Sequence, residues 1–112
     1  MSCGCNFKRN EDDCITNAGF SYMVLMAFKS LGEKEASRQQ VFFKIKSMFG
    51  DHFHQTDKDK FDKQCDGARR HLVDRKVLEQ TKIWGIWTLT EFGWATLDDL
   101  LADLTITAWA SE

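Results

Sequence analysis

Apolar side chains recur from Ile15 onward at the spacing of one helix face. A first stripe advances in steps of four, three and four residues, which predicts a helix that ends at the cap residue Gly32. A second helix is predicted over residues 34–49, where apolar residues again repeat at helical spacing before Gly50. The short connection between these helices favours their packing as neighbours. The first stripe consists of Phe20, Val24, Ala27 and Leu31.

The third predicted helix has both a start signal and a regular stripe. Thr56, with Asp59 three residues later, has the pattern of a capping box. The following apolar positions repeat at four, three and four residues and therefore share one face of a helix that runs to Asp74 or Arg75. These positions are Phe61, Cys65, Ala68 and Leu72.

The period of the sequence changes after the third helix. Residues 77–80 and 83–90 are rich in β-branched and aromatic side chains, which predicts two strands joined as a hairpin. The turn is expected either at Thr81 and Lys82 or around Gly85. Three helices followed by a two-stranded hairpin is the order of a winged helix-turn-helix, so the expected fold class is mainly α, of the α+β type.

A three-helix unit of this length leaves one side of its core open, and the hairpin is expected to cover it. Trp87 and Leu89 share one strand face and are the candidates for the side that points inward. Trp84 stands near the tip of the hairpin and is expected to be exposed.

An additional C-terminal helix is predicted over residues 91–104, with Thr90 as its cap. Its stripe of tryptophan and leucine either packs back onto the first helix or forms the seam of a homodimer. Trp109 is expected to pack within the subunit or across a dimer. The expected organisation is a cysteine-rich arm at 1–14, a winged-helix domain at 15–90, and an amphipathic helix with a tail at 91–112.

Charge is spread unevenly along a chain whose net charge is −2. Residues 29–82 hold thirteen Lys and Arg against nine Asp and Glu, whereas residues 83–112 hold five acids and no Lys or Arg. Any contact with a polyanion is therefore expected from the middle of the chain.

Length and composition restrict the class of protein. The 112 residues fit one domain with one hydrophobic core. No apolar run approaches the roughly 18 residues that a membrane helix needs, and the N-terminus lacks the pattern of a secretory signal. We therefore expect a cytoplasmic protein whose cysteines are thiols.

The stretch from Phe61 to Gly93 has an aromatic residue, then Ala-Arg and a leucine on the third helix, an apolar pair that opens the hairpin, and the pattern Gly-x-Trp-x-Leu-Thr-x-x-Gly. This stretch resembles the winged-helix module at the N-terminus of Mrr-type restriction endonucleases. The family has a glycine between the third helix and the hairpin, where this chain has Arg75 and Lys76, and 112 residues leave no room for a nuclease core. The resemblance implies a DNA-binding or adaptor module without the enzyme. The residues that carry it are Phe61, Ala68, Arg69, Leu72, Val77, Leu78, Gly85, Trp87, Leu89, Thr90 and Gly93.

The third helix is the candidate recognition helix. Its polar side chains have donors for phosphates and base edges, and Gly67 would let the backbone approach DNA closely. Asp59, Asp66 and Asp74 lie on the same predicted face and would oppose phosphate, so the alternative is a solvated face of mixed charge. The candidate DNA-binding residues are Lys58, Lys60, Lys63, Gln64, Gly67, Arg70, His71 and, on the hairpin, Lys82.

Two functions are consistent with these features. The first is a small winged-helix protein that binds double-stranded DNA as a transcriptional or mobile-element regulator. The second is a non-catalytic protein-interaction module of the same fold, such as a phage-type inhibitor or an adaptor, in which an exposed Trp84 binds the partner.

Metal binding and catalysis have weaker support in the sequence. Cys3, Cys5 and Cys14 could bind zinc with a histidine, but Cys-x-Cys is not the usual Cys-x-x-Cys pattern and a second pair is missing. Cys65 lies on an apolar stripe, where a buried thiol is expected. No nucleophile motif or phosphate loop occurs, so we predict no enzyme, no cofactor and no metal site.

Overall fold

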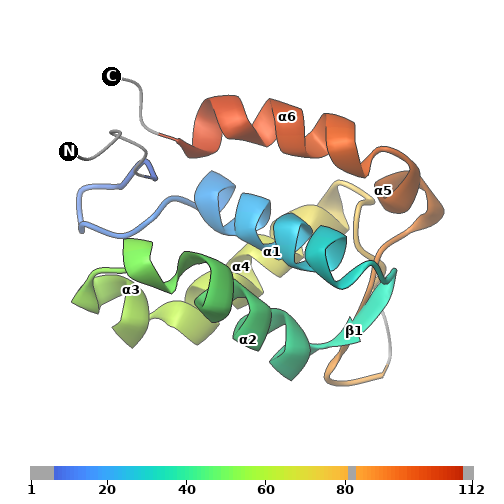
Figure 1. The fold of residues 1–112 in the computed structure, drawn as a ribbon, viewed down its shortest axis with the longest axis horizontal. Helices are drawn as coiled ribbons and strands as arrows, with labels where there is room; N and C mark the ends of the chain where they lie inside the picture. The colour runs from blue at the N-terminus through green and yellow to red at the C-terminus, as the bar shows by residue number, and fades with distance from the viewer. Residues whose placement is uncertain (1–6, 81–82, 110–112) are drawn as a thin grey trace.

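The computed structural model describes residues 7–80 and 83–109 and is mainly helical, with a small antiparallel sheet at one end (Figure 1). Figure 1 shows α1 in the middle, with α6 on one side and α2 on the other. The elements are α1 Asn17–Leu31, β1 Glu35–Ser37, α2 Arg38–Phe49, the 3-10 helix η1 Gly50–His52, α3 Gln55–Asp59, α4 Phe61–Asp74, β2 Ile86–Thr88, α5 Glu91–Ala95 and α6 Leu97–Ala108.

Helix α1 is the central element of the core. It begins where the side chain of Thr16 accepts a hydrogen bond from the backbone N–H of Gly19. It ends as predicted at Gly32, whose left-handed φ of 70° lets its N–H reach the last carbonyls of the helix. Because α1 packs against α2, α4 and α6, it is buried on several faces. Its buried apolar residues are Phe20, Met23, Val24, Leu25, Ala27 and Phe28.

The start of the second helix differs from the prediction of a helix from residue 34. Residues Glu35–Ser37 form strand β1, and α2 begins only at Arg38. Ser37 and Gln40 make a capping box, in which each side chain accepts a hydrogen bond from the other residue's backbone N–H. This cap sets the helix start four residues later than the hydrophobic pattern indicated.

The sheet also differs from the predicted two-stranded hairpin. The regular partner of β2 is β1, with Ala36 opposite Trp87, rather than the segment 77–80. That segment lies on the other side of β2 and pairs with it only briefly, since Leu78 and Leu89 form an isolated antiparallel bridge. Residues 83–85 form a turn instead of continuing the strand. β1 was missed because three residues carry too little alternation to indicate a strand.

The inward face of the predicted hairpin is confirmed. Trp87 and Leu89 are buried, and the indole of Trp87 meets the ring of Phe42 edge-on at 5.7 Å between ring centroids. Trp84 is 91% exposed, as expected for a residue near the tip. Strand β2 therefore covers the core with the indole of Trp87, whereas the turn before it leaves the indole of Trp84 exposed to solvent.

The predicted third helix is split into α3 and α4 at Lys60. Thr56 and Asp59 do not form the expected capping box, because the Thr56 hydroxyl donates to the backbone carbonyl of Asp13. The carboxylate of Asp57 accepts the backbone N–H of His54 at the start of α3 instead. The apolar stripe of α4 is buried as predicted and consists of Phe61, Cys65, Ala68 and Leu72.

The N-terminal segment is packed from Phe7 onward, whereas the sequence indicated an arm through residue 14. Phe7 and Cys14 are buried. The ring of Phe7 stacks on Trp109 with 4.1 Å between centroids, and the N–H of Lys8 donates to the carbonyl of Ala108. The expected packing of Trp109 is confirmed, and the first and last described residues lie side by side.

The C-terminal helix forms as two pieces, α5 and α6, which meet at Thr96. The predicted cap is confirmed, because the Thr90 hydroxyl accepts the N–H of Gly93 at 2.9 Å. Leu97 and Leu101 of α6 are buried, and α6 packs along α1. The apolar stripe is thus used within the subunit, and a homodimer through this helix stays a prediction. Among the described residues, no helix combines the length and apolar character needed to cross a bilayer.

Candidate nucleic-acid interface

The outward face of α4 brings three of the predicted DNA-binding residues together. Its apolar stripe is buried, which turns Lys63, Gly67 and Arg70 toward solvent on the opposite face. Together with Asp66 they line a shallow hollow on the surface. A side chain added at Gly67 would meet nothing within 4 Å, so the backbone is open to a large ligand at this point.

Asp66 is paired rather than free on this face. The guanidinium of Arg38, the first residue of α2, donates from Nε to Oδ1 at 3.2 Å and from Nη2 to Oδ2 at 2.9 Å. The hydrogen bonds that Arg38 donates to Asp66 raise the pKa of Arg38 above its usual value, so the arginine remains charged. The same guanidinium lies 4.3 Å from the ring centroid of Phe42. The pair offsets one of the three acids that the sequence placed against DNA.

The other acids predicted on this face have different surroundings. Asp59 lies in α3, at the other side of the break at Lys60, and accepts a hydrogen bond from the amide of Gln55 at 2.9 Å. Asp74 is exposed at the last position of α4. The centre of the outward face of α4 therefore carries Lys63, Arg70 and a single acid, Asp66, whose charge is paired with that of Arg38.

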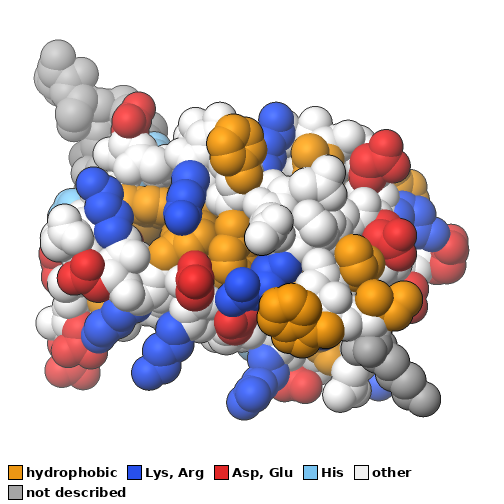
Figure 2. All heavy atoms as spheres, turned by 90° about the horizontal axis from the view of Figure 1, so that it is seen from below, with side chains coloured by type: hydrophobic (Ala, Val, Ile, Leu, Met, Phe, Trp, Pro, Cys, Tyr) orange, Lys and Arg blue, Asp and Glu red, His pale blue; other side chains and the backbone are white. Residues whose placement is uncertain are grey.

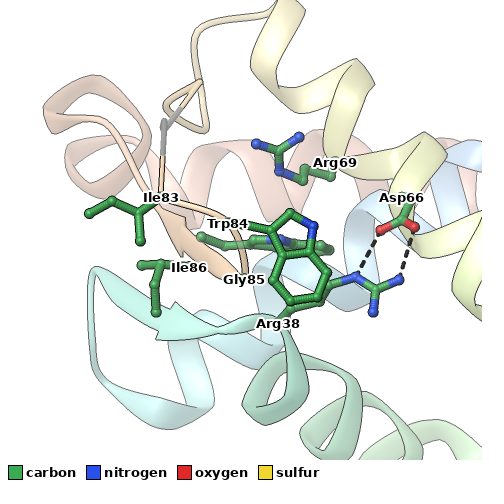
Figure 3. Close-up of a pocket in the computed structure, with 8 residues that line it drawn as sticks. Arg38, Asp66, Arg69, Ile83, Trp84, Gly85 and Ile86 are labelled. Atoms are coloured by element: carbon green, nitrogen blue, oxygen red, sulfur yellow. Dashed lines mark hydrogen bonds and ion pairs between the residues drawn. The ribbon is translucent and has the colours of Figure 1, made fainter.

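A cleft of about 440 Å³ lies beside this face, between α4 and the turn before β2. Figure 3 shows its charged walls: Asp66 and Arg69 come from α4, and Arg38 comes from the start of α2. Trp84 and Trp87 supply aromatic surface. Asp66 lines both the cleft and the hollow over Gly67, so the two are neighbours on the surface.

The turn that carries Trp84 is tied to the body of the protein. Gly85 has a φ of 83°, a left-handed conformation that suits glycine. Its carbonyl accepts the backbone N–H of Arg38 at 2.8 Å. Because β2 begins at the next residue and pairs with β1, Trp84 is held at a defined place next to α2 and α4. The predicted contact Lys82 lies outside the described residues.

Two other predicted contacts, Gln64 and His71, are half-buried on the flanks of α4. His71 lines a separate groove with residues of α1 and α6, away from the hollow over Gly67. Lys60 is exposed at the break before α4. The structure thus gathers Lys63, Gly67 and Arg70 and leaves His71 on another side.

Lys58 lines a further hollow, at the junction of α2, η1 and α4. It faces Phe53 and Phe61 together with Lys46, whose Nζ lies 4.6 Å from the ring centroid of Phe61. Figure 2 shows apolar atoms exposed between Lys and Arg side chains on the face seen from below. Lys46 was not predicted from local sequence, because Phe61, the ring that it contacts, is distant in the chain.

Three residues of the site were missed or misjudged from the sequence. Arg38 was not singled out and Arg69 was named only as part of the family resemblance, although both line the cleft and Arg69 lies 5.9 Å from the ring centroid of Trp87. Asp66 was counted as an opposing charge. The capping pattern of Ser37 and Gln40 could have indicated that Arg38 starts a helix, but its partner could not be known from local sequence.

The described cysteines are packed inside the protein. Burial, followed by the nearby carboxylates of Asp66 and Asp62, raises the pKa of the Cys65 thiol far above its usual value, so the reactive thiolate is disfavoured. Cys14 is also buried. Within residues 7–80 and 83–109, no group of three His, Cys, Asp or Glu is placed to hold a metal ion. Cys3 and Cys5 lie outside the described residues.

The loop histidines have partners of their own. His52 meets the rings of Phe7 and Trp109, with centroids 5.4 Å and 5.6 Å away. His54 shares a hydrogen bond of 2.8 Å between its Nδ1 and the carboxylate of Asp13. Both therefore contribute to the packing of the N-terminal segment.

Comparisons with protein-family models, with curated proteins and with solved structures find no match to this chain. Its function must therefore be inferred from the geometry of the site.

Proposed function

We propose that this chain is a winged-helix DNA-binding module, with α4 as its recognition helix and the turn at 83–85 as the tip of its wing. The order of elements supports this: a helix, a short strand, three further α-helices with the short η1 after the first of them, and then a β-ribbon. The ribbon consists of the segment 77–79 and residues 88–90, joined by a hydrogen bond from the N–H of Glu79 to the carbonyl of Thr88 at 2.8 Å. β1 completes the sheet on the other side.

The observation that carries the proposal is the outward face of α4. Lys63 and Arg70 are exposed on either side of Gly67, one helical turn apart from it. A helix of this kind fits the major groove, where the cations can donate to base edges and phosphates. The ion pair of Asp66 with Arg38 removes much of the repulsion that a free carboxylate would cause.

The role that we propose is that of a DNA-binding regulator without chemistry of its own. The described cysteines are buried, and the histidines of the loop after α2 are used in packing and hydrogen bonding. The cations that face solvent on α4 serve recognition. The DNA is double-stranded, because only a duplex offers a groove that accepts a helix.

The proposal is tested by fluorescence anisotropy with a labelled random duplex at two salt concentrations. Affinity should fall steeply as salt rises, because phosphate contacts release counterions. Lys63→Ala and Arg70→Ala should each weaken binding by about 1–3 kcal/mol or reduce the salt slope by about 1.

Lys29→Ala is the matched control, because it removes the same charge from the side of the molecule where Lys29 pairs with Asp98 of α6. Equal losses in the control and in the two α4 variants would mean that net charge alone drives binding. Binding that is absent, or independent of salt, would contradict the proposal.

The exposure of Trp84 favours a second candidate function, the protein-interaction module. An indole that is 91% exposed on an anchored turn is typical of a residue that is buried on binding. In that case a partner protein would be captured by the wild-type chain and lost with Trp84→Ala, while Lys63→Ala would have no effect on capture.

A further inference from the structure

Trp84 is the most exposed of the large apolar side chains in the described part of the protein. Its turn is short and fixed, since the carbonyl of Gly85 accepts the N–H of Arg38 and β2 follows directly. The backbone that carries the indole is therefore anchored beside the cleft. A rigid aromatic ring in water offers a flat surface at little cost in conformational entropy when a ligand covers it.

The cleft beside Trp84 combines that surface with positive charge. Arg38 and Arg69 stand in its wall, and only Asp66 opposes them among its lining residues (Figure 3). Because the carboxylate of Asp66 is engaged by Arg38, Arg69 is the cation left to meet an anion. A flat apolar ring next to a guanidinium matches the two parts of a nucleotide, a base that stacks and a phosphate that accepts hydrogen bonds.

The cleft also lies next to the face of α4 on which we propose that duplex DNA binds. Asp66 lines the cleft and the hollow between Lys63 and Arg70, so the cleft lies within reach of a strand that leaves the face of α4. Within a paired duplex both faces of each base are covered by its neighbours. A base with a free face occurs where the duplex ends, at an overhang or at a bulge.

We infer that the cleft between Trp84 and Arg69 binds one unpaired nucleotide of a DNA whose duplex lies on α4, with the base stacked on the indole and the phosphate at the guanidinium. The inference rests on the proposed function and adds a preference to it. The chain should bind a junction of duplex and single strand more tightly than an uninterrupted duplex. The volume of about 440 Å³ is in the range of sites for small ligands, roughly 300–1,000 Å³.

The test uses the full chain and one duplex in five forms: blunt, with a 3′ overhang, with a 5′ overhang, and with an abasic version of each overhang. The abasic overhangs keep the phosphates and remove the bases, so they separate stacking from charge. At least one overhang should raise affinity about tenfold over the blunt duplex, in the range for one base on one aromatic ring. The matching abasic overhang should lose that gain.

Two substitutions assign the gain to the cleft. Trp84→Ala should bring the ratio of overhang to blunt affinity close to one, and Trp84→Phe should keep part of it because a smaller ring still stacks. Because Trp84 is exposed, both variants should keep the circular dichroism spectrum and melting temperature of the wild type. Arg69→Gln should lower the affinity for normal and abasic overhangs alike, since it removes the phosphate contact.

The outcomes distinguish this inference from the proposed function. Salt-dependent duplex binding with equal affinity for base-bearing and abasic overhangs overturns the inference and leaves the proposed function standing. If the protein binds only DNA that has an unpaired base, the result supports nucleotide binding in the cleft and overturns the proposal that α4 binds a duplex. No binding to any of the DNAs overturns both. A Trp84→Ala variant with an unchanged overhang preference also overturns the inference, and capture of a protein by Trp84 would then be the better explanation of its exposure.

Discussion

Arg38 of α2 and Asp66 of α4 hold each other through two hydrogen bonds, at 2.9 Å and 3.2 Å, across the edge of the proposed DNA-binding face. The pair joins two helices through residues that are 28 positions apart in the chain. It also changes the electrostatics of α4, because a carboxylate that would repel phosphate is matched by a cation.

Removing the acid should strengthen DNA binding. Asp66→Asn takes one negative charge from the edge of the α4 face and frees Arg38 to reach phosphate. We expect duplex affinity to rise about fivefold, which corresponds to about 1 kcal/mol for a partly exposed charge. Anisotropy titrations measure the change, with Asp99→Asn on exposed α6 as the control of equal charge. An equal rise in duplex affinity for Asp99→Asn would mean that net charge, and not the position of Asp66 beside the α4 face, changes DNA binding.

Substitution of Gly67 should separate stability from DNA binding. Because nothing lies within 4 Å of a methyl group at this position, Gly67→Ala should raise the free energy of unfolding by about 0.5–1 kcal/mol through helix propensity. The same methyl group should weaken duplex binding if DNA approaches the backbone there. Urea unfolding and anisotropy measure the two effects on one sample.

Gly32→Ala is the comparison for that variant. Gly32 ends α1 at a φ of 70°, where an alanine is strained, so this substitution should lower stability. Stabilisation by Gly67→Ala without any loss of affinity would remove Gly67 from the proposed interface.

The N-terminal segment should depend strongly on one buried carboxylate. Asp57 is fully buried and accepts hydrogen bonds from Arg9 at 2.7 Å and from the backbone N–H groups of Ile15 and His54, both at 2.9 Å. Asp57→Ala leaves all three donors without this acceptor and should cost about 3–5 kcal/mol. Urea unfolding followed by circular dichroism measures the loss. The exposed pair of Lys29 and Asp98 provides the contrast, since Asp98→Ala should cost about 1 kcal/mol or less.

The ion pair of Lys34 with Glu91 should make a small, acid-sensitive contribution to stability. The hydrogen bond and charge of Lys34 lower the pKa of Glu91 from its usual 4.5. A carboxyl whose pKa is lower in the folded state stabilises the protein above its unfolded pKa, and this stability is lost as pH falls through the folded pKa. The melting temperature of Glu91→Gln should therefore be below that of the wild type at pH 7, and the difference should vanish well below pH 4.5.

Added salt should also reduce that difference, because both side chains are exposed enough for ions to screen the pair. A difference that persists at low pH and at high salt would show that Glu91 acts through packing or helix capping instead.

The local patterns of the sequence were sufficient for several parts of this protein. The end of α1 at Gly32, the buried stripe of α4 and the cap at Thr90 depend on residues within a few positions of one another. The inward face of Trp87 and Leu89 follows from the alternation of a strand. Such features are predictable because helix period, capping and strand alternation are set by neighbouring residues.

The features that decide the candidate site come from contacts between distant segments. Strand β1 exists because Glu35–Ser37 meets β2 about fifty positions later, and three residues show no alternation of their own. The pairing of Arg38 with Asp66, and the anchoring of the Trp84 turn on Arg38, likewise need the packed core to bring their groups within hydrogen-bonding distance. The amino-acid sequence by itself determined which faces are apolar and where α1, α2 and α4 stop. Only the tertiary structure decided that Asp66 pairs with Arg38 and that Trp84 is exposed in the cleft that Arg69 also lines. These relationships depend on distances between segments that are far apart in the chain, which neighbouring residues do not set.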